Sequence, residues 1–195
     1  MAANLVQIDD VIPRAYQDQI EEETRGMPWF FKEETGRRIS AVPTTYSGFS
    51  NTIFHINDAS IGPSTMTALL LPLLYVYCDR AQIPFNTLLR IRLGLFPRTM
   101  IDVPHHNPHV DFYQRHKNAL YYVNDSDGDT VLFNETFDDV SLEQSVLYTR
   151  DNKFTVAAKA SPKKGRMIGF DGGQYHASMH PMKHASRIAI AFSFL

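Results

Sequence analysis

A histidine and an aspartate of this chain are spaced in a way that suits metal coordination. His109 is separated from Asp111 by a single residue. In an extended chain, side chains at positions i and i+2 point to the same face about 7 Å apart, so both could reach one ion. A solvated pair in a loop is the alternative interpretation, and a third ligand is needed to decide between the two.

His176 is the candidate for that third ligand. It follows a strand-like run at residues 166–170 and a glycine-containing turn at 171–173, which places it near a sheet. Two imidazoles and one carboxylate form a facial triad that leaves coordination positions open on one side of an octahedral ion, as in Fe(II) oxygenases. Closed structural zinc sites have no such opening. We therefore predict a catalytic metal centre made of His109, Asp111 and His176.

An arginine follows at a distance that suits a second binding function. Arg187 lies eleven residues after His176, at the start of the last strand-like run, residues 187–194. A fixed guanidinium group there could hold a carboxylate through two parallel hydrogen bonds. We expect an anionic cosubstrate at this position. A strand-edge arginine paired with an acid is the alternative.

The last three histidines also permit a different metal site. His176, His180 and His184 recur every four residues, a spacing that would align them as zinc ligands on a helix. The glycines at 172–173 and Pro181 oppose a helix in this segment, so we do not expect these three histidines to form a zinc site on a helix.

Four other basic residues have open roles. His105 and His106 lie close to the predicted triad, but neither has a carboxylate two positions on, so we expect them next to the metal ligands or at the surface. A contact with the substrate is the alternative. Arg90 and Arg92 alternate with apolar residues in a predicted strand. They either face solvent or, at the mouth of a barrel, bind an anionic group of the substrate.

These residues must be positioned by secondary structure, and the first half of the chain predicts mainly helices. A helix is predicted from Pro13 to Arg25, and a second from Pro63 or Ser64 to about Gln82, with a wide apolar face and Pro72 inside it. Between them, residues 29–31 predict a short strand. Residues 39–55 predict irregular structure with one or two edge strands.

The second half is rich in β-branched and aromatic residues. Seven strands are predicted there, at residues 88–95, 119–123, 130–133, 145–149, 154–158, 166–170 and 187–194. Short strands separated by Gly, Pro, Asp and Asn turns favour an antiparallel sandwich or barrel, and a cupin-like jelly roll suits this number of strands. We expect one mostly β domain with flanking helices, in which residues 1–85 support a β core at 86–195.

Composition excludes several classes of function. The chain has 195 residues and a formal net charge of −2 with no basic block, so we expect no nucleic-acid partner. The longest apolar stretch, residues 68–78, is shorter than the ~20 residues that a spanning helix needs, so we expect no membrane partner. A single cysteine, Cys78, and the lack of a signal-peptide pattern predict a cytoplasmic protein.

Several short motifs follow one another in a recognisable order. After His109-x-Asp111 come Tyr-Val-Asn-Asp at 122–125, Gly-Asp-Thr at 128–130, residues 165–170, His176, Pro181 and Arg187. This order resembles the 2-oxoglutarate and Fe(II)-dependent dioxygenases, in the prolyl 4-hydroxylase-like branch, over roughly residues 88–195. Features near the N-terminus are also similar to small phage and marine bacterial members, namely Trp29, Phe30, Phe54 and His55.

The resemblance implies a double-stranded β-helix that binds Fe(II), 2-oxoglutarate as cosubstrate and O2. The implied catalytic and metal-binding residues are His109, Asp111 and His176. Arg187 would pair with the distal carboxylate of 2-oxoglutarate, and Tyr122 and Thr130 would contact the same molecule. The implied reaction hydroxylates a small molecule or a peptidyl residue, prolyl included, while 2-oxoglutarate is decarboxylated to succinate.

The chain also departs from that family. Many relatives carry a tyrosine on the strand before His-x-Asp, where this chain has Gly94, Leu95 and Phe96, and residues 192–194 replace a common tryptophan. Two alternatives therefore stay open: a metal-binding cupin enzyme that does not use 2-oxoglutarate, and a non-catalytic β-helix interaction module. The position of Arg187 argues against the first, and retention of all three candidate ligands argues against the second.

Overall fold

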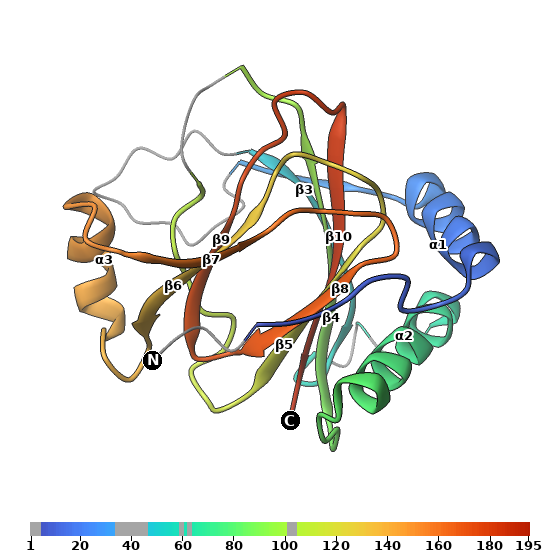
Figure 1. The fold of residues 1–195 in the computed structure, drawn as a ribbon, viewed down its shortest axis with the longest axis horizontal. Coiled ribbons are helices and arrows are strands. Elements are labelled where there is room, and N and C mark those ends of the chain that lie inside the picture. The colour runs from blue at the N-terminus through green and yellow to red at the C-terminus, as the bar shows by residue number, and fades with distance from the viewer. Residues whose placement is uncertain (1–4, 34–46, 59–60, 62–63, 101–104) are drawn as a thin grey trace.

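Within the part of the chain that the structure describes, the fold is built from two antiparallel sheets with three flanking helices (Figure 1). A computed structural model describes residues 5–33, 47–58, 61, 64–100 and 105–195. None of the helices in these ranges is long and apolar enough to cross a membrane.

The larger sheet has seven strands, and all of its pairings are antiparallel. Its order is β1 (Val6–Ile8), β8 (Met167–Asp171), β5 (Lys117–Tyr122), β10 (Ser186–Phe194), β4 (Leu88–Pro97), β3 (Gly48–His55) and β2 (Phe30–Lys32). The smaller sheet consists of β7 (Val156–Ala160), β6 (Thr130–Thr136) and β9 (Gln174–Ser178), in that order. The predicted class, mostly β with flanking helices, is confirmed.

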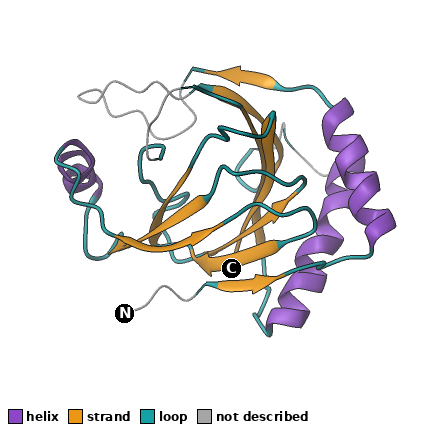
Figure 2. Ribbon diagram, turned by 45° about the horizontal axis from the view of Figure 1, so that its top comes forward, coloured by secondary structure: helices purple, strands orange, loops and turns teal. Residues whose placement is uncertain are grey.

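Two helices, α1 (Arg14–Gly26) and α2 (Thr65–Ala81), lie along the outer face of the larger sheet (Figure 2). The apolar face of α2 buries Leu73 and Tyr77 in the same core cluster as Ile91 and Leu93 of β4. Full burial of one such leucine stabilises the fold by roughly 1.5–3 kcal/mol. A capping box at Ser64 begins this helix. The outer face of β4 is therefore fixed by packing, and its other face is turned inward.

The third helix, α3 (Leu142–Arg150), corrects the predicted strand at residues 145–149. Its β-forming residues suggested a strand, but the helix begins with a second capping box. There the Ser141 side chain accepts from the Gln144 backbone N–H, and the Gln144 side chain accepts from the Ser141 backbone N–H. Reciprocal satisfaction of two backbone donors outweighs the weak local strand propensity of the next few residues.

The segment before α2 differs in one respect from the prediction. β3 pairs with β2 on one side and with β4 on the other, so it is an inner strand, and β2 is the edge. Residues 39–46, and Pro63 as a helix start, lie outside the described residues. Two short strands, β1 and β9, were not predicted at all.

Candidate active site

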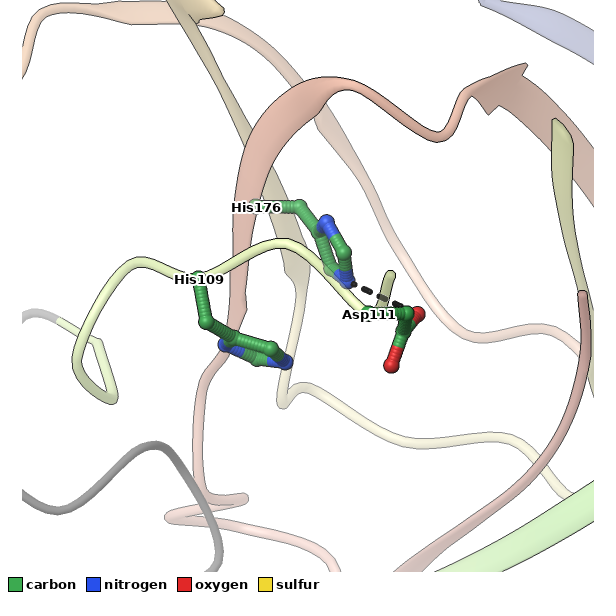
Figure 3. A group of neighbouring side chains, drawn as sticks. All are labelled: His109, Asp111 and His176. Atoms are coloured by element: carbon green, nitrogen blue, oxygen red, sulfur yellow. Dashed lines mark ion pairs between the residues drawn. The ribbon is translucent and has the colours of Figure 1, made fainter. Parts of the chain in front are cut away.

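Three predicted metal ligands lie together between the two sheets. His109 and Asp111 come from the loop that precedes β5, and His176 comes from β9 (Figure 3). One ligand atom from each of the three residues lies within 4.8 Å of the others. The predicted triad is therefore a spatial cluster and not a solvated loop pair.

Backbone pairing brings these distant segments together. The N–H of His109 donates to the carbonyl of His176 and the reverse bond is also formed, both at 3.0 Å. His176 is held in turn by the pairing of β9 with β6, opposite Leu132. The turn between β8 and β9 leads the chain from the larger sheet into the smaller one, and there Gly172 lies so close to His116 that a Cβ would meet its ring at 2.2 Å.

The ring orientation of both histidines suits metal binding. Nδ1 of His109 lies 3.1 Å from the carbonyl oxygen of Asn107, and Nδ1 of His176 lies 3.2 Å from that of Gln174. Nδ1–H donates in both contacts, so the lone pair is on Nε2, the nitrogen that a metal would take. Burial lowers the pKa of His109 to about 4, with a further contribution from His176. His109 is therefore neutral at pH 7, as a ligand must be.

The carboxylate among the candidate ligands, Asp111, is held by two neighbours that the sequence did not single out for this role. Its Oδ1 accepts from Arg90, and its Oδ2 accepts from the Asn118 side chain at 3.0 Å. Oδ2 also lies 3.5 Å from Nε2 of His176. Burial by itself raises the pKa of Asp111, but Arg90 and the two histidines hold it well below its usual range. The carboxylate is thus ionised and oriented toward the imidazoles.

Arg187 lies at the start of β10, and only 2% of its surface is exposed. Its Nη2 donates to Oγ1 of Thr130 at 2.8 Å, and the Tyr122 hydroxyl donates to the same oxygen at 2.7 Å. The rings of Phe96 and Tyr122 flank the guanidinium group at 5.5 and 5.6 Å. Nε of Arg187 is buried and has no partner among the described residues. A buried cation with an unused donor is a fit for an incoming anion.

One pocket contains both features. Its lining includes the three triad residues together with Thr130, Arg187, Arg90 and Arg92. The two arginines of β4 therefore face the inside of the barrel, where Arg90 pairs with Asp111, and not the solvent. His106 is also buried and lines the pocket, whereas His105 packs edge-on against Phe133.

The zinc-helix alternative is wrong. His176 belongs to strand β9, which ends at Ser178, and the residues up to β10 form no helix. Nδ1 of His180 contacts the carbonyl of Pro97, and His184 pairs with Asp127. The three rings therefore do not share one face.

Comparisons with known proteins identify the architecture. No protein-family model and no curated protein sequence matches this chain. Among solved structures, an oxidoreductase of the 2OG-Fe(II) oxygenase family from Burkholderia pseudomallei aligns with 97% of this chain and 84% of its own, at 10% identity and a TM-score of 0.63. A prolyl hydroxylase from Trichoplax adhaerens, in complex with a hypoxia inducible factor oxygen degradation domain peptide fragment, aligns with 99% and 84%, at 14% identity and a TM-score of 0.57.

A third matching structure contains iron and alpha ketoglutarate, which is 2-oxoglutarate. The epimerase SnoN, in complex with Fe3+, alpha ketoglutarate and nogalamycin RO, aligns with 100% of this chain and 79% of its own, at 14% identity and a TM-score of 0.65. At this level of identity the likeness establishes the fold. The chain has the double-stranded β-helix fold of the 2-oxoglutarate and Fe(II)-dependent oxygenases, as the motif order implied. The comparisons give no support to the resemblance to phage members.

Proposed function

We propose that this protein is an Fe(II)- and 2-oxoglutarate-dependent dioxygenase that hydroxylates its substrate. The observation that carries the proposal is the presence, in one pocket, of a two-histidine, one-carboxylate cluster and a buried arginine with an unused donor. The first group has the donor set of a non-haem Fe(II) site with open positions. The second can receive the distal carboxylate of a diacid.

In this proposal His109, Asp111 and His176 hold the iron. Arg187 receives the distal carboxylate of 2-oxoglutarate, with Thr130 and Tyr122 beside it. When bound, Fe(II) with 2-oxoglutarate and O2 supplies the oxidising chemistry, in which 2-oxoglutarate loses CO2 to give succinate and one oxygen atom enters a C–H bond.

The residues of this chain position the reactants and exclude water. Asn118 and Arg90 keep the Asp111 carboxylate aimed at the histidines, and the two backbone carbonyls keep Nε2 of each imidazole available. Phe96 and the Tyr122 ring shield the Arg187 guanidinium group from solvent, which strengthens its attraction for a carboxylate. A dry, preorganised pocket of this kind favours one bound orientation of the cosubstrate.

Several finer assignments belong to the same proposal. The substrate is a small molecule or a peptidyl residue, prolyl included, and not a nucleic acid or a membrane lipid. Residues 1–195 act as one domain, with 86–195 as the catalytic core. A cytoplasmic setting suits such an enzyme, because a reducing compartment keeps iron ferrous and Cys78 has no second cysteine in the sequence to pair with.

The test is anaerobic addition of Fe(II) and then 2-oxoglutarate to the protein, followed by visible absorption spectroscopy. We expect a charge-transfer band from the chelate, and succinate after oxygen is admitted. His109→Ala and Asp111→Ala should lose the band, whereas His184→Ala, which removes an exposed histidine outside the pocket, should keep it. Iron binding without any response to 2-oxoglutarate would favour a cupin of another class, and no metal binding would favour a non-catalytic module.

A further inference from the structure

The inward face of β4 carries a second cationic group that the proposed chemistry does not use. Arg90 and Arg92 are two residues apart and both line the pocket. Arg90 is committed to Asp111. Toward the residues that the structure describes, the Arg92 side chain makes neither a hydrogen bond nor an ion pair, although it is partly buried. A partly buried guanidinium group without a counter-ion is stabilised by a ligand that supplies one.

The charges around Arg92 reinforce this requirement. Burial lowers the pKa of Arg92, and the neighbouring Arg90 lowers it further. Asp111 acts in the opposite direction, but it already accepts from Arg90 and belongs to the proposed metal site. Asp111 is the only carboxylate among the described residues that line the pocket, against three arginines. The pocket is therefore short of negative charge even after the triad has formed.

The position of Arg92 separates it from the cosubstrate end of the pocket. Arg92 lies opposite Ala191 on β10, whereas Phe96 lies opposite Arg187. Four positions along a strand correspond to about 13 Å between the backbone positions of Arg92 and Phe96. The side chains of Arg92 and Arg187 therefore start from backbone positions at opposite ends of the pocket wall.

The floor between them is made of small residues. Gly94 on β4 is flanked by Ser50 on β3 and Ala189 on β10, and all three line the pocket. A Cβ built on Gly94 would meet only the ring of Phe96, at 3.8 Å, so the space above this residue is open. An organic molecule can therefore lie on this floor with one end at Arg92 and its middle near the triad.

We infer that Arg92 is a substrate-binding residue and that the substrate oxidised at this site carries a carboxylate group. This inference rests on the proposed function, because it assigns Arg187 to 2-oxoglutarate and leaves Arg92 for the second reactant. A carboxylate would supply the counter-ion that the described residues lack, and the fork of the guanidinium group would fix its orientation. The C–H bond to be oxidised then lies on the part of the molecule that extends from Arg92 over Gly94 toward the triad.

The experiment compares phenylacetate with its neutral isostere phenylacetamide. Each is titrated calorimetrically into protein loaded with Ni(II), which is inert to oxygen, and saturating 2-oxoglutarate, so that the cosubstrate end is filled. We expect phenylacetate to bind the native protein about tenfold more tightly or better, the usual effect of a charge-assisted pair. Arg92→Gln should reduce this preference to less than about threefold, and Arg92→Lys should retain part of it.

The matched control is Arg98→Gln, which removes the same charge from an exposed position just beyond β4 and should leave the preference intact. The inference is overturned if the native protein does not prefer phenylacetate, or if the preference survives in Arg92→Gln. It is also overturned if Arg92→Gln weakens 2-oxoglutarate binding instead, since Arg92 would then serve the cosubstrate. Absence of the Fe(II)–2-oxoglutarate band would defeat the proposed function separately. The same comparison on metal-free protein would still test Arg92 if it is made in the Arg187→Met background, which removes the other guanidinium group that could bind phenylacetate.

Discussion

Replacing Arg187 by methionine removes the buried guanidinium group and keeps most of the length of its stem. In the structure one N–H of that group donates to Thr130, and Nε has no partner, so donors remain free to bind a carboxylate. Hydrogen bonds to a charged group contribute about 1.5–3 kcal/mol, which corresponds to a loss of 2-oxoglutarate affinity of about 10- to 150-fold. Stability should change little, because removing an uncompensated buried charge offsets the lost bond.

The assay is anaerobic titration of 2-oxoglutarate into Fe(II)-loaded native and Arg187→Met protein, followed through the charge-transfer band. Fe(II) affinity should be unchanged, because Arg187 contacts none of the three proposed ligands. Arg98→Gln controls for loss of one positive charge, and thermal unfolding controls for damage to the fold. An affinity for 2-oxoglutarate within twofold of native, in a variant that melts normally, would refute the role assigned to Arg187.

Two further predictions concern stability. Gly169→Ala should destabilise the protein by roughly 1–3 kcal/mol in urea unfolding, because a Cβ there would meet the Tyr77 hydroxyl at 2.4 Å. Gly26→Ala is the control and should not destabilise it, because a Cβ there would meet nothing within 4 Å. Equal effects of the two substitutions would contradict this prediction. The hydrogen bond from Arg166 lowers the pKa of Asp9 to about 2, so this carboxylate contributes stability above pH ~4 that is lost as the pH falls toward 2. Asp9→Asn should therefore flatten the pH dependence of unfolding over that range, by less than about 1 kcal/mol because the pair is partly solvated, and an unaltered slope would disprove it.

Elements with strong local signals could be predicted from the sequence. Pro13 and Gly26 bracket α1, and the apolar face of α2 is continuous, so both helices lie within a few residues of their expected bounds. Residues 145–149, expected as a strand, belong to a helix because the Ser141–Gln144 capping box precedes these β-forming residues and starts the helix. β1 and β9 are three and five residues long, and such short strands are defined by their partners in the sheet.

Only those site residues could be predicted whose spacing in the sequence matches the geometry of a metal site. His109 and Asp111 follow from the i, i+2 geometry, and His176 follows from the turn before it. The pairing of Arg90 and Asn118 with Asp111 depends on how β4, β10 and β5 align across long sequence separations. A lone asparagine within a strand gives no local signal of such a role.

We propose that one pocket of this protein binds a metal on the triad and a diacid on Arg187. The decisive experiment is a crystal structure from crystals grown without oxygen in the presence of Fe(II) and 2-oxoglutarate. We predict iron on Nε2 of His109, Nε2 of His176 and the Asp111 carboxylate, with the distal carboxylate of 2-oxoglutarate on Arg187. Iron bound elsewhere, or 2-oxoglutarate turned away from Arg187, would show that the proposed site is wrong.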